Sequence, residues 1–153
     1  MSKPSFLYVT YIRTTPEKLW AALTDPQTIR QYWFGMTAEC DFRPDSPWAL
    51  KFQDGRIADT GEILEAVPPR RLVIRWRNEF KPELKAEGWS RCAFEIEMAQ
   101  YYPDFGGNAV KLTIRHELDG EGDKFIAAVS GGWPKVVSNL KSLLETGDVA
   151  FKE

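Results

Sequence analysis

The sequence VSGGWPKVVSNLKSLLETG at residues 129–147 constrains the fold more than any other stretch. Its apolar residues recur with helical spacing, but Gly131, Gly132 and Pro134 interrupt the helix interior, where a proline costs about 3 kcal/mol. A helix that begins near Asp123 would present one apolar stripe of ordinary width. The stripe consists of Phe125, Val129, Gly132, Trp133, Val136, Leu140, Leu143 and Leu144, while Lys135, Ser138, Asn139, Lys141 and Ser142 lie off it. The pattern predicts one long C-terminal helix with a bend near its centre.

This helix allows more than one kind of interior. Pro134 lies on its solvent side, and a helix bends away from its proline, so this one bends toward whatever it covers. Gly132 lies on the inner side and removes a side chain from the contact. The missing side chain either lets the helix approach a filled core closely or leaves space for a ligand cavity. A break into two helices near Gly131 is a third alternative.

The N-terminal part predicts one strand followed by two short helices. Residues 6–13 are rich in β-branched and aromatic side chains, which is typical of a strand. Thr15 suits the cap of a helix, and Pro16 suits its first position. Asp25 repeats this signal directly afterwards and predicts a second short helix that ends at Gly35.

The middle of the chain predicts a series of antiparallel strands. Asp54 and Gly55 form a strong hairpin signal, and the YYPDFGGN sequence at 101–108 predicts another turn. Residues 78–89 are polar and are expected to form a loop. The candidate strands are 36–43, 48–53, 56–67, 70–77, 90–100 and 109–118. These hairpins with segregated helices predict an α+β domain, in which only the last helix is long enough to cover the apolar face of the sheet.

Composition narrows the class of protein. A length of 153 residues is typical of one domain, so a single domain over 1–153 is expected. The net charge of -2 argues against nucleic acid as the main partner. The sequence contains neither the roughly 18 consecutive apolar residues that a membrane span needs nor a signal-peptide core, so a cytoplasmic protein without membrane insertion is expected.

Few residues offer catalytic chemistry. His116 is the only histidine, and the alternation of its strand points it inward, where it is a weak candidate for acid–base catalysis. Cys40 and Cys92 stand apart and are expected to be buried, reduced thiols, and no metal site of ordinary spacing can be drawn. Glu39 and Asp41 are expected on the solvent side of their strand, because burying two carboxylates is costly.

Several motifs together carry a family resemblance. They are Y-x-x-x-I-x-T-T-P-E-K-L-W-A-A-L-T-D-P from Tyr8, QYWFG at 31–35, DTGEILEAVPPRRLVIRW at 59–76 and GGWPKVVSNLKSLLETG at 131–147. Over about 6–147 the chain resembles the bacterial activator-of-heat-shock-protein-ATPase-like family. That family belongs to the START-like, helix-grip superfamily, which also contains polyketide cyclases and plant pollen allergens.

The resemblance implies a fold and several kinds of function. The fold is a curved antiparallel sheet of about seven strands that grips the long C-terminal helix, with two short helices after the first strand. A cavity between sheet and helix, often open to apolar ligands, is also implied. A chaperone partner and a stress-related role are further expectations.

The leading hypothesis is a binding protein for a small apolar or aromatic ligand that catalyses no reaction and needs no cofactor. The expected lining consists of Trp33, Trp48, Trp76, Phe94, Met98, His116, Trp133 and Val137, with His116 as the polar contact. Two alternative functions remain open. The first is a cyclase-like or hydrolase-like enzyme that uses His116, and the second is a co-chaperone or protein-interaction module that binds through its outer face. Independently of function, an exposed sheet edge could pair two copies into a homodimer.

Overall fold

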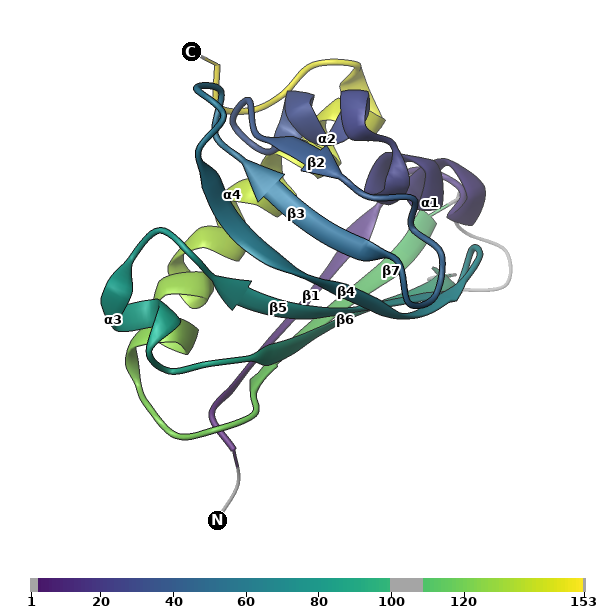
Figure 1. Ribbon diagram of the computed structural model, residues 1–153. Coiled ribbons are helices and arrows are strands. Elements are labelled where there is room, and N and C mark those ends of the chain that lie inside the picture. The colour runs from purple at the N-terminus through teal and green to yellow at the C-terminus, as the bar shows by residue number, and fades with distance from the viewer. Residues whose placement is uncertain (1–2, 100–108, 153) are drawn as a thin grey trace.

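The computed structural model describes residues 3–99 and 109–152, so the predicted turn at 101–108 lies outside the described residues. One antiparallel sheet of seven strands forms in the order β1-β7-β6-β5-β4-β3-β2 (Figure 1). The strands are β1 (Ser5–Ile12), β2 (Thr37–Glu39), β3 (Pro47–Lys51), β4 (Ile57–Val67), β5 (Arg71–Asn78), β6 (Ser90–Ala99) and β7 (Ala109–Leu118). The helices are α1 (Pro16–Thr24), α2 (Pro26–Tyr32), α3 (Pro82–Lys85) and α4 (Lys124–Thr146).

Side-chain caps start both short helices. The hydroxyl oxygen of Thr15 accepts a hydrogen bond from the backbone N–H of Lys18 at 3.2 Å, and a carboxylate oxygen of Asp25 accepts from the N–H of Thr28 at 3.2 Å. Each bond satisfies a backbone donor that has no partner inside its helix. The two helices after β1 therefore form where the sequence predicts them, although α2 ends at Tyr32 rather than at Gly35.

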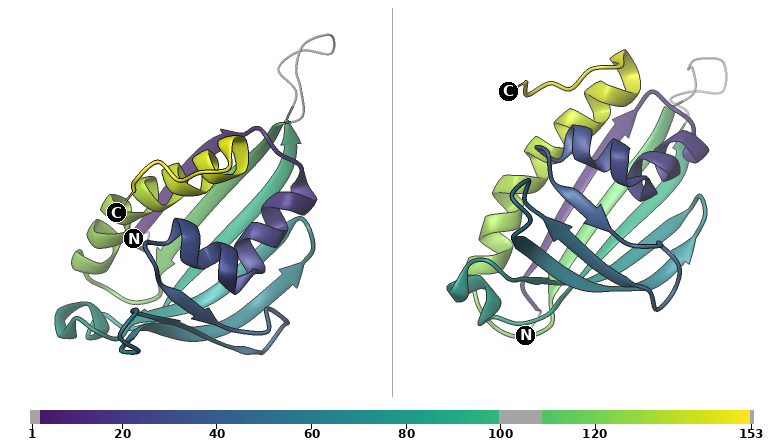
Figure 2. Two further views of the ribbon diagram at one scale, coloured as in Figure 1. Left: turned by 90° about the horizontal axis from the view of Figure 1, so that it is seen from above. Right: turned by 45° about the horizontal axis from the view of Figure 1, so that its top comes forward.

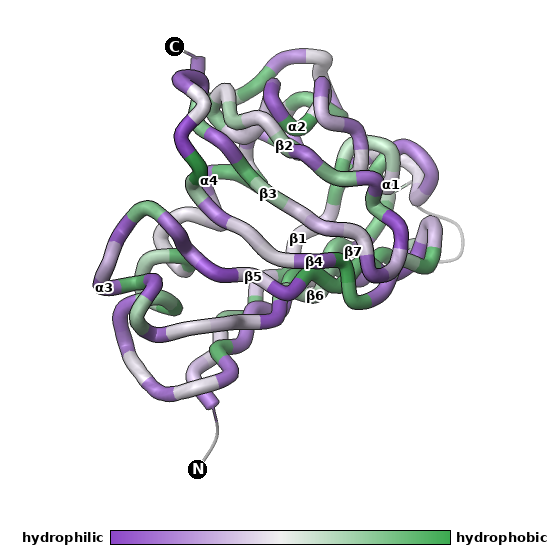
Figure 3. The backbone as a smooth tube through the Cα atoms, viewed as in Figure 1, coloured by the Kyte–Doolittle hydropathy of each residue, from purple (hydrophilic) through white to green (hydrophobic). Residues whose placement is uncertain are grey.

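The sheet curves around α4 (Figure 2). The pairing register shifts once between β3 and β4 and once between β4 and β5, and such bulges increase the bend and twist of a sheet. Gly61 lies where β4 passes close to β5, because a Cβ atom built there would be 1.6 Å from the carbonyl oxygen of Arg75. In Figure 3, hydrophobic and hydrophilic residues alternate along the strands, as expected for a sheet with one covered face.

The helix α4 runs unbroken through Gly131, Gly132 and Pro134 and lies across the concave face of the sheet (Figure 2). It buries Phe125, Trp133, Val136, Val137, Asn139 and Leu140, and it ends at Gly147 in the left-handed conformation. The predicted helix-grip architecture is therefore confirmed, and the alternative of two separate helices is wrong. Asn139, which the helical spacing of the sequence places off the apolar stripe, is buried as well.

Some local predictions were wrong for identifiable reasons. The strand predicted at 36–43 shortens to β2, because Phe42 adopts a positive φ angle that extended backbone does not allow. The predicted loop at 78–89 contains the short helix α3, whose Leu84 is buried. In the 70–77 strand, the alternation of side chains predicts that Leu72, Ile74 and Trp76 face inward and Val73 faces outward, but Val73 is buried as well. Cys92 is buried as expected, whereas Cys40 is only half-buried.

The centre between sheet and helix is filled. The internal void there measures about 20 Å³ and has apolar walls that include Trp48, Phe94 and Val137. This volume holds about one water molecule and no organic ligand. Of the two interiors that the sequence left open, the filled core is the one found at the centre of the grip.

Candidate functional site

An open groove lies at one end of the grip, beside α3, and we call it the α3 groove. It has a volume of about 280 Å³. Its walls come from β4, β5, the 80–84 segment, the N-terminal half of α4 and Trp33, which follows α2. Figures 1 and 2 show α3 next to the first turns of α4, and Leu84 of α3 lines the groove.

Three tryptophans form the inner wall of the α3 groove. The ring centroid of Trp33 lies 5.1 Å from that of Trp133 and 5.7 Å from that of Trp76, and the Trp76 and Trp133 centroids are 5.7 Å apart. Trp133 is edge-on to both neighbours, a favourable arrangement of aromatic rings. The wall is therefore a packed, rigid aromatic surface. Phe80 and Phe125 add further aromatic lining.

The glycine that weakens α4 opens the groove. Gly132 is one of the lining residues, and a Cβ atom built on it meets nothing within 4 Å. Gly131 is equally free of neighbours but is exposed and does not line the groove. The space under the helix is therefore at the groove, beside Gly132, and not at the centre of the core.

Asp59 brings a carboxyl group to the groove. It lies on β4, is 8% exposed, and accepts a hydrogen bond through Oδ1 from the indole Nε1–H of Trp76 at 3.0 Å. Burial raises the pKa of Asp59 to about 7, and the negative charge of Glu79 acts in the same direction, while the Trp76 bond opposes both. The carboxyl group therefore changes charge near neutral pH.

Asn78 stands directly opposite Asp59 on β5. It is 6% exposed and lines the groove, and its Oδ1 accepts from the backbone N–H of Lys81 at 2.9 Å. A backbone N–H needs an acceptor, so this bond fixes which end of the amide is oxygen. The amide Nδ2 is thereby turned away from Lys81.

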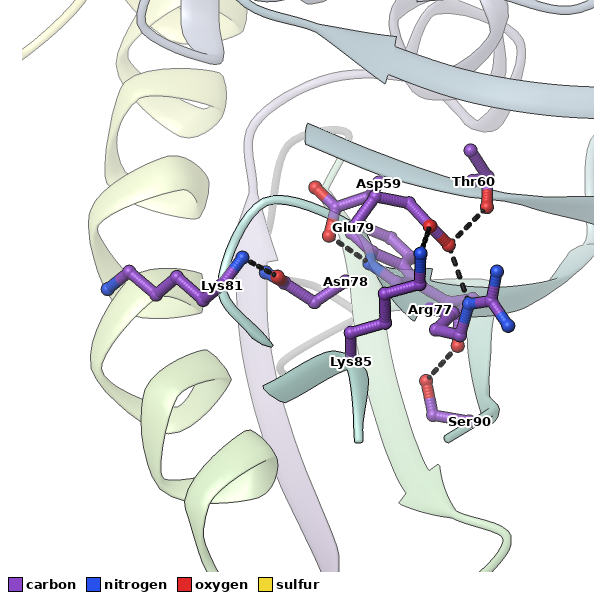
Figure 4. Close-up of polar contacts among 9 residues, drawn as sticks. Asp59, Thr60, Arg77, Asn78, Glu79, Lys81, Lys85 and Ser90 are labelled. Carbon is purple, nitrogen blue, oxygen red and sulfur yellow. Dashed lines mark hydrogen bonds and ion pairs between the residues drawn. The ribbon is translucent and has the colours of Figure 1, made fainter. Parts of the chain in front are cut away.

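A network of charged groups borders this pair on the outer side (Figure 4). Glu79 accepts hydrogen bonds from Thr60 at 2.8 Å and from Arg77 at 2.6 Å, and it forms an ion pair with Lys85 at 3.1 Å. Partial burial alone would raise the pKa of Glu79, but these partners hold it at about 2. Glu79 is consequently a fixed negative charge next to the titrating Asp59.

His116 is completely buried, and both of its ring nitrogens are occupied. Its Nδ1 accepts from the indole Nε1–H of Trp133 at 3.1 Å, and its Nε2 lies 2.9 Å from the hydroxyl of Ser90. Burial lowers its pKa to about 3, so the ring is neutral at physiological pH. It orients the tryptophan wall from behind and does not line the groove.

The structure places the eight predicted lining residues in four locations. Trp33, Trp76 and Trp133 line the α3 groove and also border the filled centre. Trp48, Phe94 and Val137 lie around the filled centre, and His116 lies behind the wall. Met98 is 57% exposed and lies near Pro16 and Pro69, away from the groove.

The sequence interpretation missed Asp59 and Asn78. A signal was available on β5, because Leu72, Ile74 and Trp76 were expected to face inward and the next inward position is Asn78. On β4, Ile63 is fully buried, and counting back by twos reaches Gly61 and then Asp59. A polar residue at the inward position of an otherwise apolar strand marks a site.

A curved antiparallel sheet that grips a long helix, with an aromatic groove at one end, defines a START-like, helix-grip protein. The family model described as "Activator of Hsp90 ATPase homolog 1-like protein" matches residues 13–145, and the chain belongs to this family. A search of curated proteins finds no match.

Solved structures share the fold at low sequence identity. CalU16 from Micromonospora echinospora is 22% identical with a TM-score of 0.69, and the match covers 94% of this chain and 77% of that one. An Hsp90 activator from Plasmodium falciparum is 22% identical with a TM-score of 0.72, covering 92% and 95%. The Aha1 dimer from Colwellia psychrerythraea is 18% identical with a TM-score of 0.71, covering 94% and 98%.

The described residues contain neither a cluster of metal-binding side chains nor a helix suited to a membrane. Within 3–99 and 109–152, no group of three or more His, Cys, Asp or Glu side chains is placed to hold a metal ion. None of the helices described here combines the length and apolar character needed to cross a membrane.

Proposed function

We propose that this protein binds a small aromatic ligand in the α3 groove without chemical conversion. The observation that supports this most directly is the groove itself, an open space of about 280 Å³ against three packed tryptophans. Ligand sites are typically concave and mostly apolar, with a few well-placed polar groups. Asp59 and Asn78 supply those groups.

The volume sets the size of the ligand. At about 280 Å³, the α3 groove is slightly smaller than the range of about 300–1,000 Å³ that is typical of small-molecule sites. It suits a flat ligand of two or three rings rather than a long acyl chain. Such a ligand would stack on or abut the indole rings, and each well-formed aromatic contact contributes about 0.5–1.5 kcal/mol beyond the buried area.

Adjacent glycines in α4 provide a matched test. Gly132→Leu places a side chain in the groove, whereas Gly131→Leu places the same side chain on the exposed face of the same helix. Both changes raise helix propensity by a similar amount, up to about 1 kcal/mol. The probe is N-phenyl-1-naphthylamine, which is neutral and fluoresces in apolar surroundings.

We expect the parent protein and Gly131→Leu to bind the probe with the same affinity, and Gly132→Leu to bind it at least about tenfold more weakly. Thermal unfolding of all three proteins shows whether each is folded. Equal binding by both variants would place the probe elsewhere, and absence of binding to the parent protein would remove the proposal.

An enzyme that uses His116 has less support from the geometry. Both ring nitrogens have partners, and neither faces the groove. If the groove catalyses proton transfer, Asp59 is the group positioned for it, since its pKa of about 7 matches that role. His116 would then contribute only through the placement of Trp133.

Family membership supports a second candidate function, which is contact with a chaperone as a co-chaperone in a stress response. Such contact would use the outer surface, where Leu7, Val9 and Tyr11 of the edge strand β1 are exposed. Binding to purified Hsp90 is the test. A co-chaperone of this kind binds Hsp90 equally well with Gly132→Leu, while a ligand-dependent one does not.

Three further expectations remain proposals. We propose that residues 1–153 form one domain, that the protein works in the cytoplasm, and that β1 pairs with a second copy. The last point draws on the Colwellia homologue, whose solution structure is a dimer. Light scattering of the purified protein at several concentrations distinguishes a monomer from such a dimer.

A further inference from the structure

Two residues that line the α3 groove each carry a polar atom that has no partner among residues 3–99 and 109–152. Oδ2 of Asp59 and Nδ2 of Asn78 take part in none of the hydrogen bonds found there, while Oδ1 of each side chain is occupied. Both residues are more than nine-tenths buried. Among the described residues, Oγ1 of Thr14 is the only polar side-chain atom that is both inaccessible to solvent and without a hydrogen-bond partner. Oδ2 of Asp59 and Nδ2 of Asn78 are therefore accessible to solvent. The groove is therefore the place where these two atoms find a partner.

The side chains of Asp59 and Asn78 together form one polar edge of the α3 groove. Asp59 and Asn78 are direct partners across β4 and β5, so they lie on the same face of the sheet with their Cβ atoms about 5 Å apart. Trp76 fixes the carboxyl group, and the backbone of Lys81 fixes the amide. The free atoms are a carboxylate oxygen, which accepts, and an amide nitrogen, which donates.

We infer that the α3 groove selects flat aromatic ligands that carry an N–H donor beside a carbonyl acceptor, as in a fused cyclic amide, with the N–H bound to Asp59 and the carbonyl to Asn78. This inference rests on the proposed function, since it assigns the chemistry of the ligand to the same groove. The inference also predicts the orientation of the bound ligand: the polar edge of the ligand faces β4 and β5, and its rings contact the tryptophans.

The charge state of Asp59 makes this recognition depend on pH. Only the ionised carboxylate accepts from an N–H at both oxygens, one toward Trp76 and one toward the ligand. The pKa of about 7 therefore predicts that affinity for a cyclic amide rises with pH through neutrality and then levels off.

Few other charges act on this titration. Glu79 raises the pKa, and its own charge is neutralised in part by Arg77 and Lys85. Lys81 lines the groove, and the lining contributed by α4 carries no titratable group. His116, behind Trp76, stays neutral above about pH 3.

The experiment compares quinazolin-4(3H)-one with its 3-methyl derivative by calorimetry at pH 5.5 to 8.5. The two probes have the same rings and the same carbonyl, but methylation removes the N–H donor. We expect the unmethylated probe to bind about tenfold to a hundredfold more tightly at pH 8, since the lost bond is to a charged group. The difference should shrink toward pH 5.5. Equal affinities for the two probes at all pH values would overturn the inference.

Asp59→Asn provides a second test with an almost isosteric side chain. The Trp76 N–H still needs an acceptor, so the new amide turns its oxygen toward Trp76 and its NH2 group toward the groove. A donor then faces the ligand N–H, and we expect selectivity for the unmethylated probe to vanish at every pH. Retention of full selectivity by this variant would also overturn the inference.

Glu79→Gln tests the effect of the Glu79 charge on the pKa of Asp59 without changing the contact between Asp59 and the ligand. Glu79 does not line the groove, so we expect the same limiting affinity at high pH with a midpoint shifted to lower pH. An unchanged midpoint would overturn the assignment of the titration to Asp59. If N-phenyl-1-naphthylamine binds and Gly132→Leu blocks it while both quinazolinones bind alike, the groove proposal stands and only the ligand class fails.

Discussion

Trp133 in α4 donates its indole Nε1–H to Nδ1 of His116 in β7 at 3.1 Å. An indole nitrogen only donates, so Nδ1 must carry no proton, and the neutral ring is protonated at Nε2. The Nε2–H then donates to Ser90, whose hydroxyl donates onward to the carbonyl oxygen of Trp76 at 2.8 Å. This chain of hydrogen bonds joins Trp133 and Trp76, two of the three tryptophans of the inner wall.

The protonation state of His116 is the first prediction. Because burial lowers its pKa to about 3, we expect the ring to remain neutral and protonated at Nε2 from pH 8 down to about pH 4. Nitrogen-15 NMR measures this directly, and the single histidine of the sequence gives an unambiguous signal. A titration near pH 6.5 would show instead that the imidazole is accessible and available for acid–base chemistry.

Replacement of His116 is expected to destabilise the fold. His116→Leu leaves the buried N–H of Trp133 without an acceptor and should lower the free energy of unfolding by about 2–4 kcal/mol, measured by urea titration. Arg115→Leu is the control, since Arg115 is the exposed neighbour on the same strand. Its free energy of unfolding should change by less than about 0.5 kcal/mol. Equal effects of the two changes would contradict the structural role of His116.

Asp59 and His116 give opposite contributions to the pH dependence of stability. The pKa of Asp59 is raised from 3.8 to about 7, so the folded state holds a proton that the unfolded state releases, and stability falls as pH rises between these values. The pKa of His116 is lowered from 6.5 to about 3, so its contribution is present above pH 6.5 and is lost as pH falls toward 3. The two slopes partly cancel in the parent protein.

Asp59→Asn removes the contribution of Asp59 to the pH dependence of the free energy of unfolding. Between pH 4.5 and 7 we expect the variant to gain about 3 kcal/mol of unfolding free energy relative to the parent protein, from 1.36 kcal/mol per pKa unit. The His116 contribution cancels in this difference. Urea titrations of both proteins across this range provide the measurement. A difference that does not vary with pH would mean that Asp59 ionises normally.

Local signals in the sequence predicted the elements well. Thr15 and Asp25 each accept a hydrogen bond from the backbone N–H three residues further along the chain. Both helix caps could therefore be predicted from the local sequence alone. The period of α4 likewise needs no knowledge of the partner that it covers. The polar contacts of the site depend instead on which strands become neighbours, and the register that pairs Asp59 with Asn78 is not encoded in either strand alone.

The alternation of side chains along a strand also gave wrong predictions of burial where other elements cover the sheet unevenly. Val73 was expected outside and is buried, while Met98 was expected inside and is exposed, because whether a face is covered changes along its length. The filled centre and the open groove could not be told apart from sequence, since both are lined by the same kinds of apolar residues. The number of aromatic residues predicts a bulky interior but not where its gap lies.

Two glycines are expected to respond in opposite ways to alanine. Gly131→Ala adds a methyl group in open space on a helix and should raise the free energy of unfolding by about 0.5–1 kcal/mol. Gly61→Ala places a Cβ atom 1.6 Å from the carbonyl oxygen of Arg75, so the strands must separate and stability should fall by more than about 2 kcal/mol. Thermal and urea unfolding measure both effects. A stabilising Gly61→Ala would mean that β4 and β5 lie farther apart.

Asn139 is expected to hold the C-terminal segment on the fold. Its Oδ1 accepts from the backbone N–H of Phe151 at 2.7 Å, and its Nδ2 donates to the carbonyl oxygen of Tyr32 at 3.3 Å. Asn139→Leu removes both bonds at a buried position and should cost about 1–3 kcal/mol. It should also speed hydrogen exchange at the Phe151 amide, because that donor then faces water. Ser138→Leu changes the exposed neighbour on the same helix and should leave this exchange unchanged, and equal exchange in both variants would show that Asn139 does not hold the segment.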